Sequence, residues 1–136
     1  MEWNVKRLAA YFMFADALFA VPGIAAAEDL AAGDASFHKW CQACHAVGVG
    51  AKNKFGPELN GLVGRQAGTA GGYQYSPAVK NAGFVWDRTS FAAFIANPRG
   101  KIPGNKMVFV GIKDETEIAD PWAYLSHFNV DGSSKC

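Results

Sequence analysis

The chain has 136 residues, which is enough for one ordinary domain and too few for two. Half of its residues are hydrophobic and 18% are charged, a composition that suits a folded globular protein and excludes an intrinsically disordered one. The formal net charge of +1 is too small to indicate binding of nucleic acid, so any charge-driven partner must be met by a local patch of the surface.

The first 27 residues have the layout of a secretory signal peptide. A basic start with Lys6 and Arg7 precedes an apolar run at residues 8–21, and three alanines stand just before Glu28. The run is shorter than the roughly 20 apolar residues that a membrane-spanning helix needs, which argues against an uncleaved anchor. We therefore predict that residues 1–27 are a signal peptide and are removed during export.

Asp16 is atypical of this assignment, because signal peptides rarely carry a charge in their apolar run. A membrane-tethered protein that keeps residues 1–27 is therefore the alternative. On the main interpretation the mature domain is residues 28–136, and it lies in the periplasm of a bacterium. Processing also removes Met1 and Met13, two of the three methionines.

Three segments of the mature chain have helical periodicity. Residues 29–45 place apolar side chains at near-helical spacing, behind acidic residues that suit the helix dipole. Residues 87–98 begin with a capping candidate at Asp87, and their helix must stop before Pro98. Residues 113–128 carry acidic residues first and apolar residues after them. We expect these segments to form the main helices.

The rest of the mature chain is predicted to be mostly loop. A short helix is expected at residues 76–83, whereas residues 46–72 are rich in glycine and favour a loop. No segment shows the alternating pattern of a half-buried strand. The predicted class is therefore all-α, with three main helices, one short helix and long loops. Pro121 falls inside the last predicted helix, which either bends there or effectively begins with Asp120 as its cap.

Cys41, Cys44 and His45 form a Cys-x-x-Cys-His motif in the stretch "WCQACHAVG". A structural zinc site needs four ligands, and the sequence has no second ligand cluster to complete one. A thioredoxin-like redox pair follows a strand, and no run of β-branched and aromatic residues precedes Cys41. The motif is instead the attachment signature of c-type haem.

The spacing of this motif has a physical reason. On a helix, residues three and four apart share a face, so the two thiols and the imidazole point to one side. The thiols can then bond the two vinyl groups of a haem while the imidazole reaches its iron. We predict one haem c, bound covalently through Cys41 and Cys44, with His45 as an iron ligand.

An electron-carrying haem needs a second axial ligand from a distant segment of the chain. Met107 is the only methionine left after processing, and the glycines and proline of "GKIPGNKMVF" favour a loop around it. A lone methionine is ordinarily core filling, but its isolation and its distance from His45 favour ligation in this chain. His38 and His127 are the rival ligands. His38 is too close to Cys41 to reach the opposite haem face, and His127 is predicted to lie on a surface helix.

Several motifs, taken in order, resemble those of a known family. They are "GDASFHKWCQACH", "FGPELNGLVGRQAG", "YQYSPAVKNAGFVW", "NPRGKIPGNKMVFVGIK" and "WAYL". From residue 33 to residue 128 the chain resembles the class I cytochromes c of the mitochondrial type, and in particular their short bacterial members. The resemblance implies a small fold around one haem, in which the first and last helices cross where Gly33 meets Tyr124.

The resemblance also assigns roles to individual residues. His45 and Met107 would be the axial ligands, and Pro57 would supply a carbonyl group that accepts a hydrogen bond from the His45 ring. Hydrogen bonds to the inner haem propionate would come from three further residues, Arg65, Tyr75 and Trp86. Without the resemblance, the two aromatic residues would be interpreted as core side chains and the arginine as a surface charge.

The implied function is that of a one-electron carrier rather than an enzyme, because the iron does the chemistry while the protein sets its potential. The protein would act as a monomer between membrane complexes such as a quinol–cytochrome c oxidoreductase, a terminal oxidase or a photosynthetic reaction centre, with transient contact to the membrane surface. Basic residues that flank the haem-bearing segments could ring the haem edge; they are Lys52, Lys54, Arg99, Lys101, Lys106 and Lys113. The alternative is a haem enzyme or ligand sensor, such as a peroxidase, which would need an open iron site.

Phe94 and Cys136 are expected to set this chain apart in two ways. Phe94 stands where the family usually has a tyrosine whose hydroxyl bonds the methionine sulfur, so the bond to Met107 is expected to differ. Cys136 is the odd thiol of the mature chain. It is either an unpaired tail residue without a role or, in an oxidising compartment, a site of pairing between chains.

Overall fold

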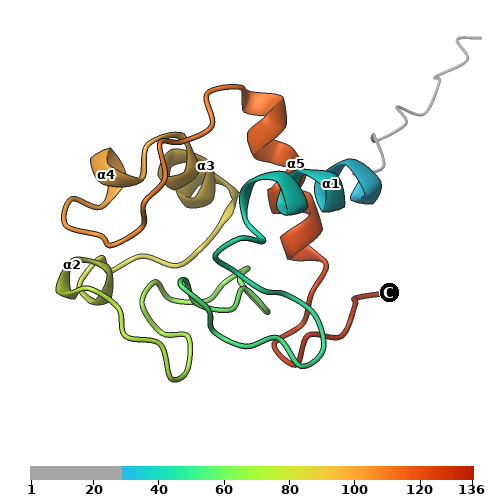
Figure 1. Cartoon of the computed structure of the whole chain (residues 1–136), viewed down its shortest axis with the longest axis horizontal. Coiled ribbons are helices and arrows are strands. Elements are labelled where there is room, and N and C mark those ends of the chain that lie inside the picture. Colours follow the sequence, from blue (N-terminus) through green and yellow to red (C-terminus); the bar gives the residue numbers. More distant parts are fainter. Residues whose placement is uncertain (1–28) are drawn as a thin grey trace, which may run out of the picture.

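The structure of the protein is a computed structural model, and it describes residues 29–136 (Figure 1). The predicted signal peptide lies outside the described residues. Within residues 29–136 the chain forms five helices joined by long loops, and no strand, which confirms the predicted all-α class. The helices are α1 (Leu30–Trp40), α2 (Pro77–Lys80), α3 (Arg88–Ala96), α4 (Pro98–Lys101) and α5 (Glu115–Ser126). No helix in this part of the chain is long and apolar enough to cross a membrane.

Side-chain caps define where the three longer helices begin. The Asp29 carboxylate accepts hydrogen bonds from two backbone N–H groups in the first turn of α1. Asp114 does the same for α5. At α3, Asp87 and Ser90 form a capping box, in which the backbone N–H of each residue donates to the side chain of the other. The predicted cap at Asp87 is therefore confirmed.

The structure corrects two predicted helix ends. The first helix ends at Trp40 rather than at His45, and the chain beyond it continues as hydrogen-bonded turns. Pro98 was predicted only to stop a helix, but it is also the first residue of the short α4. Proline suits this position because the first N–H group of a helix has no intrahelical partner. Asn97 caps α4 by accepting a hydrogen bond from the Gly100 N–H at 3.0 Å.

Helices α1 and α5 cross at Gly33. A Cβ atom at this position would lie 2.6 Å from the Asp120 carbonyl oxygen and 2.7 Å from the Tyr124 Cβ, so only glycine lets the two backbones approach this closely. Phe37, one turn further along α1, packs its ring against Tyr124 with the ring centroids 5.6 Å apart. The helix α5 runs through the buried Pro121, so the alternative helix start at Asp120 is wrong.

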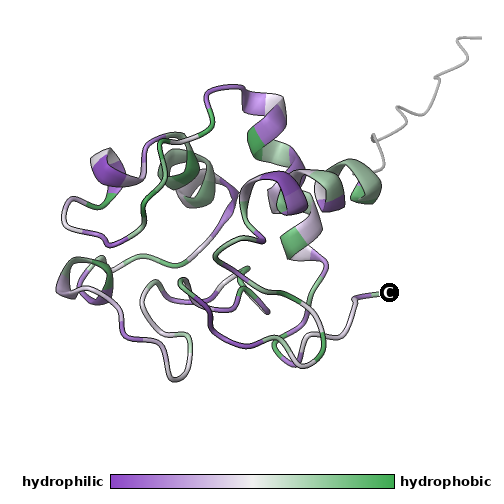
Figure 2. Cartoon of the chain, viewed as in Figure 1, coloured by the Kyte–Doolittle hydropathy of each residue, from purple (hydrophilic) through white to green (hydrophobic). Residues whose placement is uncertain are grey.

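The hydrophobic core extends from this crossing to α3. Phe91 of α3 packs against Trp122 of α5 with the ring centroids 5.2 Å apart, and Leu125 of α5 is fully buried. In Figure 2, α3 is largely hydrophobic, whereas α4 and the first turn of α5 are hydrophilic. Burying a side chain of this size contributes about 1.5–3 kcal/mol to the free energy of unfolding. These contacts therefore hold α1, α3 and α5 together, and the loops connect them.

The glycine-rich segment 46–72 contains no helix, as predicted, and α2 lies within the expected short helix at residues 76–83. Gly68 has a φ of 80°, a conformation that residues with a side chain rarely adopt. Its backbone also passes α2 so closely that a Cβ atom would lie 2.9 Å from the Val79 carbonyl oxygen. The lack of a side chain at Gly68 therefore allows this loop to pack directly against α2.

Candidate functional site

A cavity of about 630 Å³ lies between the turn after α1, the glycine-rich loop, α3 and the loop that follows α4. All of the site residues predicted from the sequence line it: Cys41, Cys44, His45, Pro57, Arg65, Tyr75, Trp86 and Met107. The remaining lining is mainly apolar and includes Leu59, Leu62, Phe94 and Ile95. The fold thus brings residues that are far apart in the sequence to one cavity.

The cysteine motif occupies a single turn at the end of α1. The N–H groups of Cys44 and His45 donate to the Cys41 carbonyl oxygen at 3.0 and 2.9 Å. This turn keeps the helical spacing of the three side chains, which line the same cavity although the helix itself has ended. Neither cysteine takes part in a disulfide bond. Burial raises the pKa of the Cys41 thiol to about 12, so this group is protonated at neutral pH until it is bonded.

His45 is oriented by the backbone of the next loop. Its Nδ1 lies 2.7 Å from the Pro57 carbonyl oxygen, and because this oxygen can only accept, Nδ1 carries the ring proton. Burial lowers the pKa of the imidazole, which is therefore neutral and keeps a lone pair on Nε2. A Cβ atom at Gly56 would overlap the His45 ring, so glycine permits this approach. The imidazole is presented as a metal ligand with one fixed tautomer.

Met107 reaches the cavity from the loop between α4 and α5, and Asn105 holds this loop in place. The Met107 N–H donates to Asn105 Oδ1 at 2.9 Å. Asn105 Nδ2 donates to the carbonyl oxygens of Pro98 at 2.8 Å and Ile102 at 2.7 Å. Sequence reasoning missed Asn105. The available signal was its residue type, because asparagine often bonds nearby backbone groups in turns.

Tyr75 precedes α2 in the sequence and Trp86 follows it, and both line the cavity. The Tyr75 hydroxyl accepts a hydrogen bond from the Ala70 N–H at 3.2 Å, and burial raises the pKa of this phenol. The Trp86 ring packs edge-on against Phe94 with the centroids 5.3 Å apart, and the backbone N–H of Trp86 donates to the Arg65 carbonyl oxygen at 2.9 Å. These contacts place two polar aromatic side chains and an arginine in one cavity lining.

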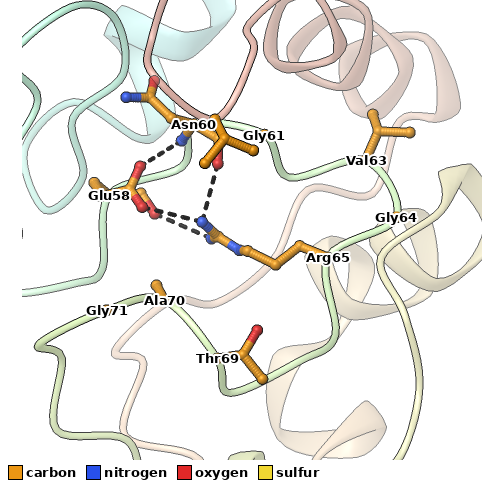
Figure 3. Close-up of a pocket in the computed structure, with 10 residues that line it drawn as sticks. Glu58, Asn60, Gly61, Val63, Gly64, Arg65, Thr69, Ala70 and Gly71 are labelled. Atoms are coloured by element: carbon orange, nitrogen blue, oxygen red, sulfur yellow. Dashed lines mark hydrogen bonds and ion pairs between the residues drawn. The ribbon is translucent and has the colours of Figure 1, made fainter.

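The Arg65 side chain is held by the segment that follows Pro57 (Figure 3). Its Nη1 donates to Glu58 Oε1 at 3.1 Å and to the Asn60 carbonyl oxygen at 3.0 Å, and its Nη2 donates to the Glu58 carbonyl oxygen at 3.0 Å. Arg65 is therefore not a simple surface charge, because its side chain is only 15% exposed. Sequence reasoning missed Glu58 and Asn60, although both lie within the motif "FGPELNGLVGRQAG" that carries Arg65.

The rival iron ligands lie outside this cavity. His38 is exposed on α1, where its ring bonds the Asp34 carbonyl oxygen at 2.9 Å, and His127 caps the C-terminal end of α5. Residues 29–136 also contain no cluster of three or more His, Cys, Asp or Glu that could hold a metal ion such as structural zinc. Two thiols, one imidazole and one thioether in a mainly apolar lining form a donor set that fits a covalently bound haem.

Two expectations from the sequence remain predictions. Phe94 is buried and lines the cavity. The expected difference in the bond to Met107 follows only from the hydroxyl group that tyrosine has and phenylalanine lacks. Cys136 is exposed and free. Its exposure suits both interpretations of this thiol, the unpaired tail residue and the site of pairing between chains.

Fold and site together define a class of small all-α proteins that hold one haem through a Cys-x-x-Cys-His motif. A sequence model of the cytochrome c family matches residues 30–129. The chain is 56% identical over 108 residues to a cytochrome c2 of Rhodoplanes tepidamans, and the matched region covers 79% of this chain and 100% of that protein. It is 58% identical over 105 residues to a cytochrome c-550 of Bradyrhizobium diazoefficiens, covering 77% of this chain and 76% of that one.

A solved structure agrees with these sequence matches. Cytochrome cH from Methylobacterium extorquens is similar with a TM-score of 0.66 and 45% identity, over 71% of this chain and 96% of that one. The chain belongs to the cytochrome c family, as the order of its motifs predicted. It is a monohaem electron carrier, and its haem c is bound covalently through Cys41 and Cys44.

Proposed function

We propose that this cytochrome carries single electrons through the periplasm between membrane complexes, with His45 and Met107 as the axial ligands of its iron. The observation that carries this proposal is that both side chains, from separate segments, line one cavity together with the two cysteines. When bound, the haem supplies an iron that alternates between Fe(II) and Fe(III) and so accepts and releases one electron. Export with removal of residues 1–27 places the protein in that compartment.

The protein's part is to hold both ligands still while the charge on the iron changes. The Pro57 carbonyl fixes the orientation of the His45 ring, and Asn105 fixes the loop that carries Met107. Because both supports come from hydrogen bonds to backbone groups, few atoms need to move when the oxidation state changes. The apolar lining keeps water away from the iron, which raises its reduction potential.

The polar residues of the cavity have a separate role in this proposal. Arg65, Tyr75 and Trp86 donate hydrogen bonds to the inner haem propionate and so compensate its charge inside the protein. Their convergence on one cavity supports this role. A carboxylate that is buried without such partners would cost several kcal/mol.

Replacing Asn105 by alanine is expected to weaken the ligation by Met107. The change leaves the Met107 N–H without its acceptor and removes the side-chain donor to the Pro98 and Ile102 carbonyl groups, which keep only their backbone donors. We expect the free energy of unfolding to fall by about 2 kcal/mol. The iron–sulfur charge-transfer band at the red edge of the visible spectrum of the oxidised protein is expected to weaken as well. Guanidinium unfolding and absorption spectroscopy measure the two effects.

Asn53→Ala is the matched control for this change. Asn53 is also a loop asparagine with two hydrogen bonds to backbone groups, the Gly71 carbonyl and the Glu58 N–H. Neither bond reaches the Met107 loop, so the loss of Asn53 is expected to lower stability and leave the band intact. Equal effects of both substitutions on the band would show that Asn105 has no special role in holding the ligand.

The mouth of the cavity is the proposed docking surface. Phe55 and Val108 line the cavity and are 87% and 91% exposed, while Lys106 lines it and Lys54 Nζ lies 3.4 Å from the His45 carbonyl oxygen. An apolar centre with lysines at its rim suits a partner that presents carboxylates, such as a quinol–cytochrome c oxidoreductase, an oxidase or a reaction centre. Acidic residues are gathered at the start of α5 instead: Asp114, Glu115 and Glu117.

Electron transfer from the reduced, haem-containing protein to membranes of its host is expected to slow as ionic strength rises, because rim charges act mainly on the association rate. Lys54→Gln is expected to lower the rate at low salt and to flatten its salt dependence. Lys135→Gln, which removes an exposed lysine of the C-terminal tail, serves as the control and is expected to change neither. A rate that is independent of salt in stopped-flow measurements would contradict docking through lysines.

A further inference from the structure

Glu58 and Arg65 form an ion pair that is largely shielded from solvent. Their nitrogen and oxygen atoms are 3.1 Å apart, and the side chains of Arg65 and Glu58 are 15% and 22% exposed. In the ion pair between Lys39 and Glu117, by contrast, the side chains are 56% and 45% exposed. Because solvent and salt screen shielded charges less, the Glu58–Arg65 pair acts more strongly on its surroundings than a surface pair does.

The Glu58 carboxylate is fixed through both of its oxygens. Oε1 accepts a hydrogen bond from Arg65, and Oε2 accepts one from the Asn60 N–H at 2.6 Å. The Glu58 N–H is itself bonded to Asn53 Oδ1 at 2.9 Å. Figure 3 shows the guanidinium held between Glu58 and Asn60. The negative charge therefore has a defined place on the segment that also provides the Pro57 carbonyl for His45.

Arg65 stands between two cavities. It lines the haem cavity, and together with Glu58 and Asn60 it also lines a second cavity of about 390 Å³, shown in Figure 3. Its bonds to Glu58 and Asn60 use Nη1 and one hydrogen of Nη2. Since a guanidinium has five N–H donors, Nε and the other Nη2 hydrogen can serve an acceptor in the haem cavity. Arg65 can thus bond Glu58 and an acceptor in the haem cavity at the same time.

We propose that Glu58 is a positioning residue that lowers the reduction potential of the haem through Arg65. The inference rests on the proposed function, in which Arg65 bonds a haem propionate. Oxidation adds one positive charge to the iron, so a nearby carboxylate stabilises the oxidised state and a nearby guanidinium stabilises the reduced state. By pairing with Arg65, the Glu58 carboxylate offsets the guanidinium charge and keeps one N–H of Nη1 away from the propionate.

Glu58→Gln in the haem-containing protein tests this role, because it removes the charge and keeps the size of the side chain. We expect the midpoint potential, measured by spectroelectrochemical titration, to shift to a more positive value. Glu58→Asp, which keeps the charge but draws it back from Arg65, is expected to give a smaller positive shift. Glu115→Gln removes the same charge at an exposed position in the first turn of α5 and is expected to leave the potential unchanged.

Arg65→Gln shows whether Glu58 acts through the arginine. This substitution is expected to shift the potential to a more negative value, and the positive shift from Glu58→Gln is expected to be smaller in the Arg65→Gln background. Equal shifts in both backgrounds would overturn the role of Glu58 as a positioning residue. The role would also be overturned if the Glu58→Gln protein unfolded at a lower concentration of guanidinium chloride but kept the wild-type potential, because that result indicates a merely structural role.

The oxidised spectrum separates this inference from the proposed iron ligation. If the iron–sulfur band is present in every variant while the potentials stay equal, the inference about Glu58 fails and ligation by Met107 stands. If the wild-type protein lacks the band, ligation by Met107 is contradicted, and the order of the measured potentials still decides the role of Glu58.

Discussion

Met107→Ala is expected to lower the reduction potential of the haem and to open its iron to carbon monoxide. Met107 lines the haem cavity, and alanine has no atom that could reach the iron from the same loop. A thioether raises the potential of haem iron relative to nitrogen or oxygen ligands, so its loss is expected to cost a sizeable part of the about 0.8 V that axial ligands span. Redox titration measures this shift, and absorption spectra record the loss of the iron–sulfur band.

Val110→Ala is the matched control for the loss of Met107. Val110 lies on the same loop and is 87% exposed, so its truncation is expected to leave the band and the potential unchanged. The reduced wild-type protein is expected to bind no carbon monoxide, whereas the reduced Met107→Ala protein is expected to bind it. Carbon monoxide binding by the wild-type protein would favour the alternative of a haem enzyme or ligand sensor and contradict firm ligation by Met107.

The largest expected loss of stability comes from Gly33→Val. Even the first atom of a side chain at this position would lie 2.6 Å from the Asp120 carbonyl oxygen and 2.7 Å from the Tyr124 Cβ. Both obstacles belong to α5, one to its backbone and one to the Cβ fixed on it, so the two helices must move apart. We expect the free energy of unfolding to fall by about 3 kcal/mol, the upper part of the usual range for overpacking. Guanidinium unfolding measures this loss.

Ala35→Val separates packing from helix propensity. Ala35 is exposed on the same helix, so valine there costs only its lower helix propensity, about 0.6 kcal/mol relative to alanine. Valine is a better helix former than glycine, so any loss at Gly33 must come from the crossing. Losses of equal size at both positions would show that the contact between α1 and α5 tolerates a side chain.

The site residues were predictable where chemistry requires a residue type at a set spacing. Two cysteines three apart with a histidine after them present two thiols and an imidazole to one side, and this holds whether the segment is a helix or a single turn. The helix was predicted to continue to His45, yet its true end at Trp40 left the placement of the motif unchanged. Met107 stood out because it is the one methionine after the predicted cleavage.

The supports of these residues depend on the tertiary structure. Asn105 acts through carbonyl groups of Pro98 and Ile102, and Glu58 acts through the guanidinium of Arg65. Such partners are chosen by how loops pass one another, and loops have no periodicity from which their path could be predicted. An asparagine and a glutamate in polar loops are ordinarily solvated, so their residue type alone indicates no role.

By itself the sequence determined the all-α class, the haem attachment and the candidate ligands, because helical periodicity and metal chemistry both follow from residue type and spacing. Only the tertiary structure decided that α5 runs unbroken through Pro121 and that Arg65 is paired with Glu58. The physical reason is that burial and charge pairing are properties of surfaces brought together, and these surfaces exist only once the chain has folded.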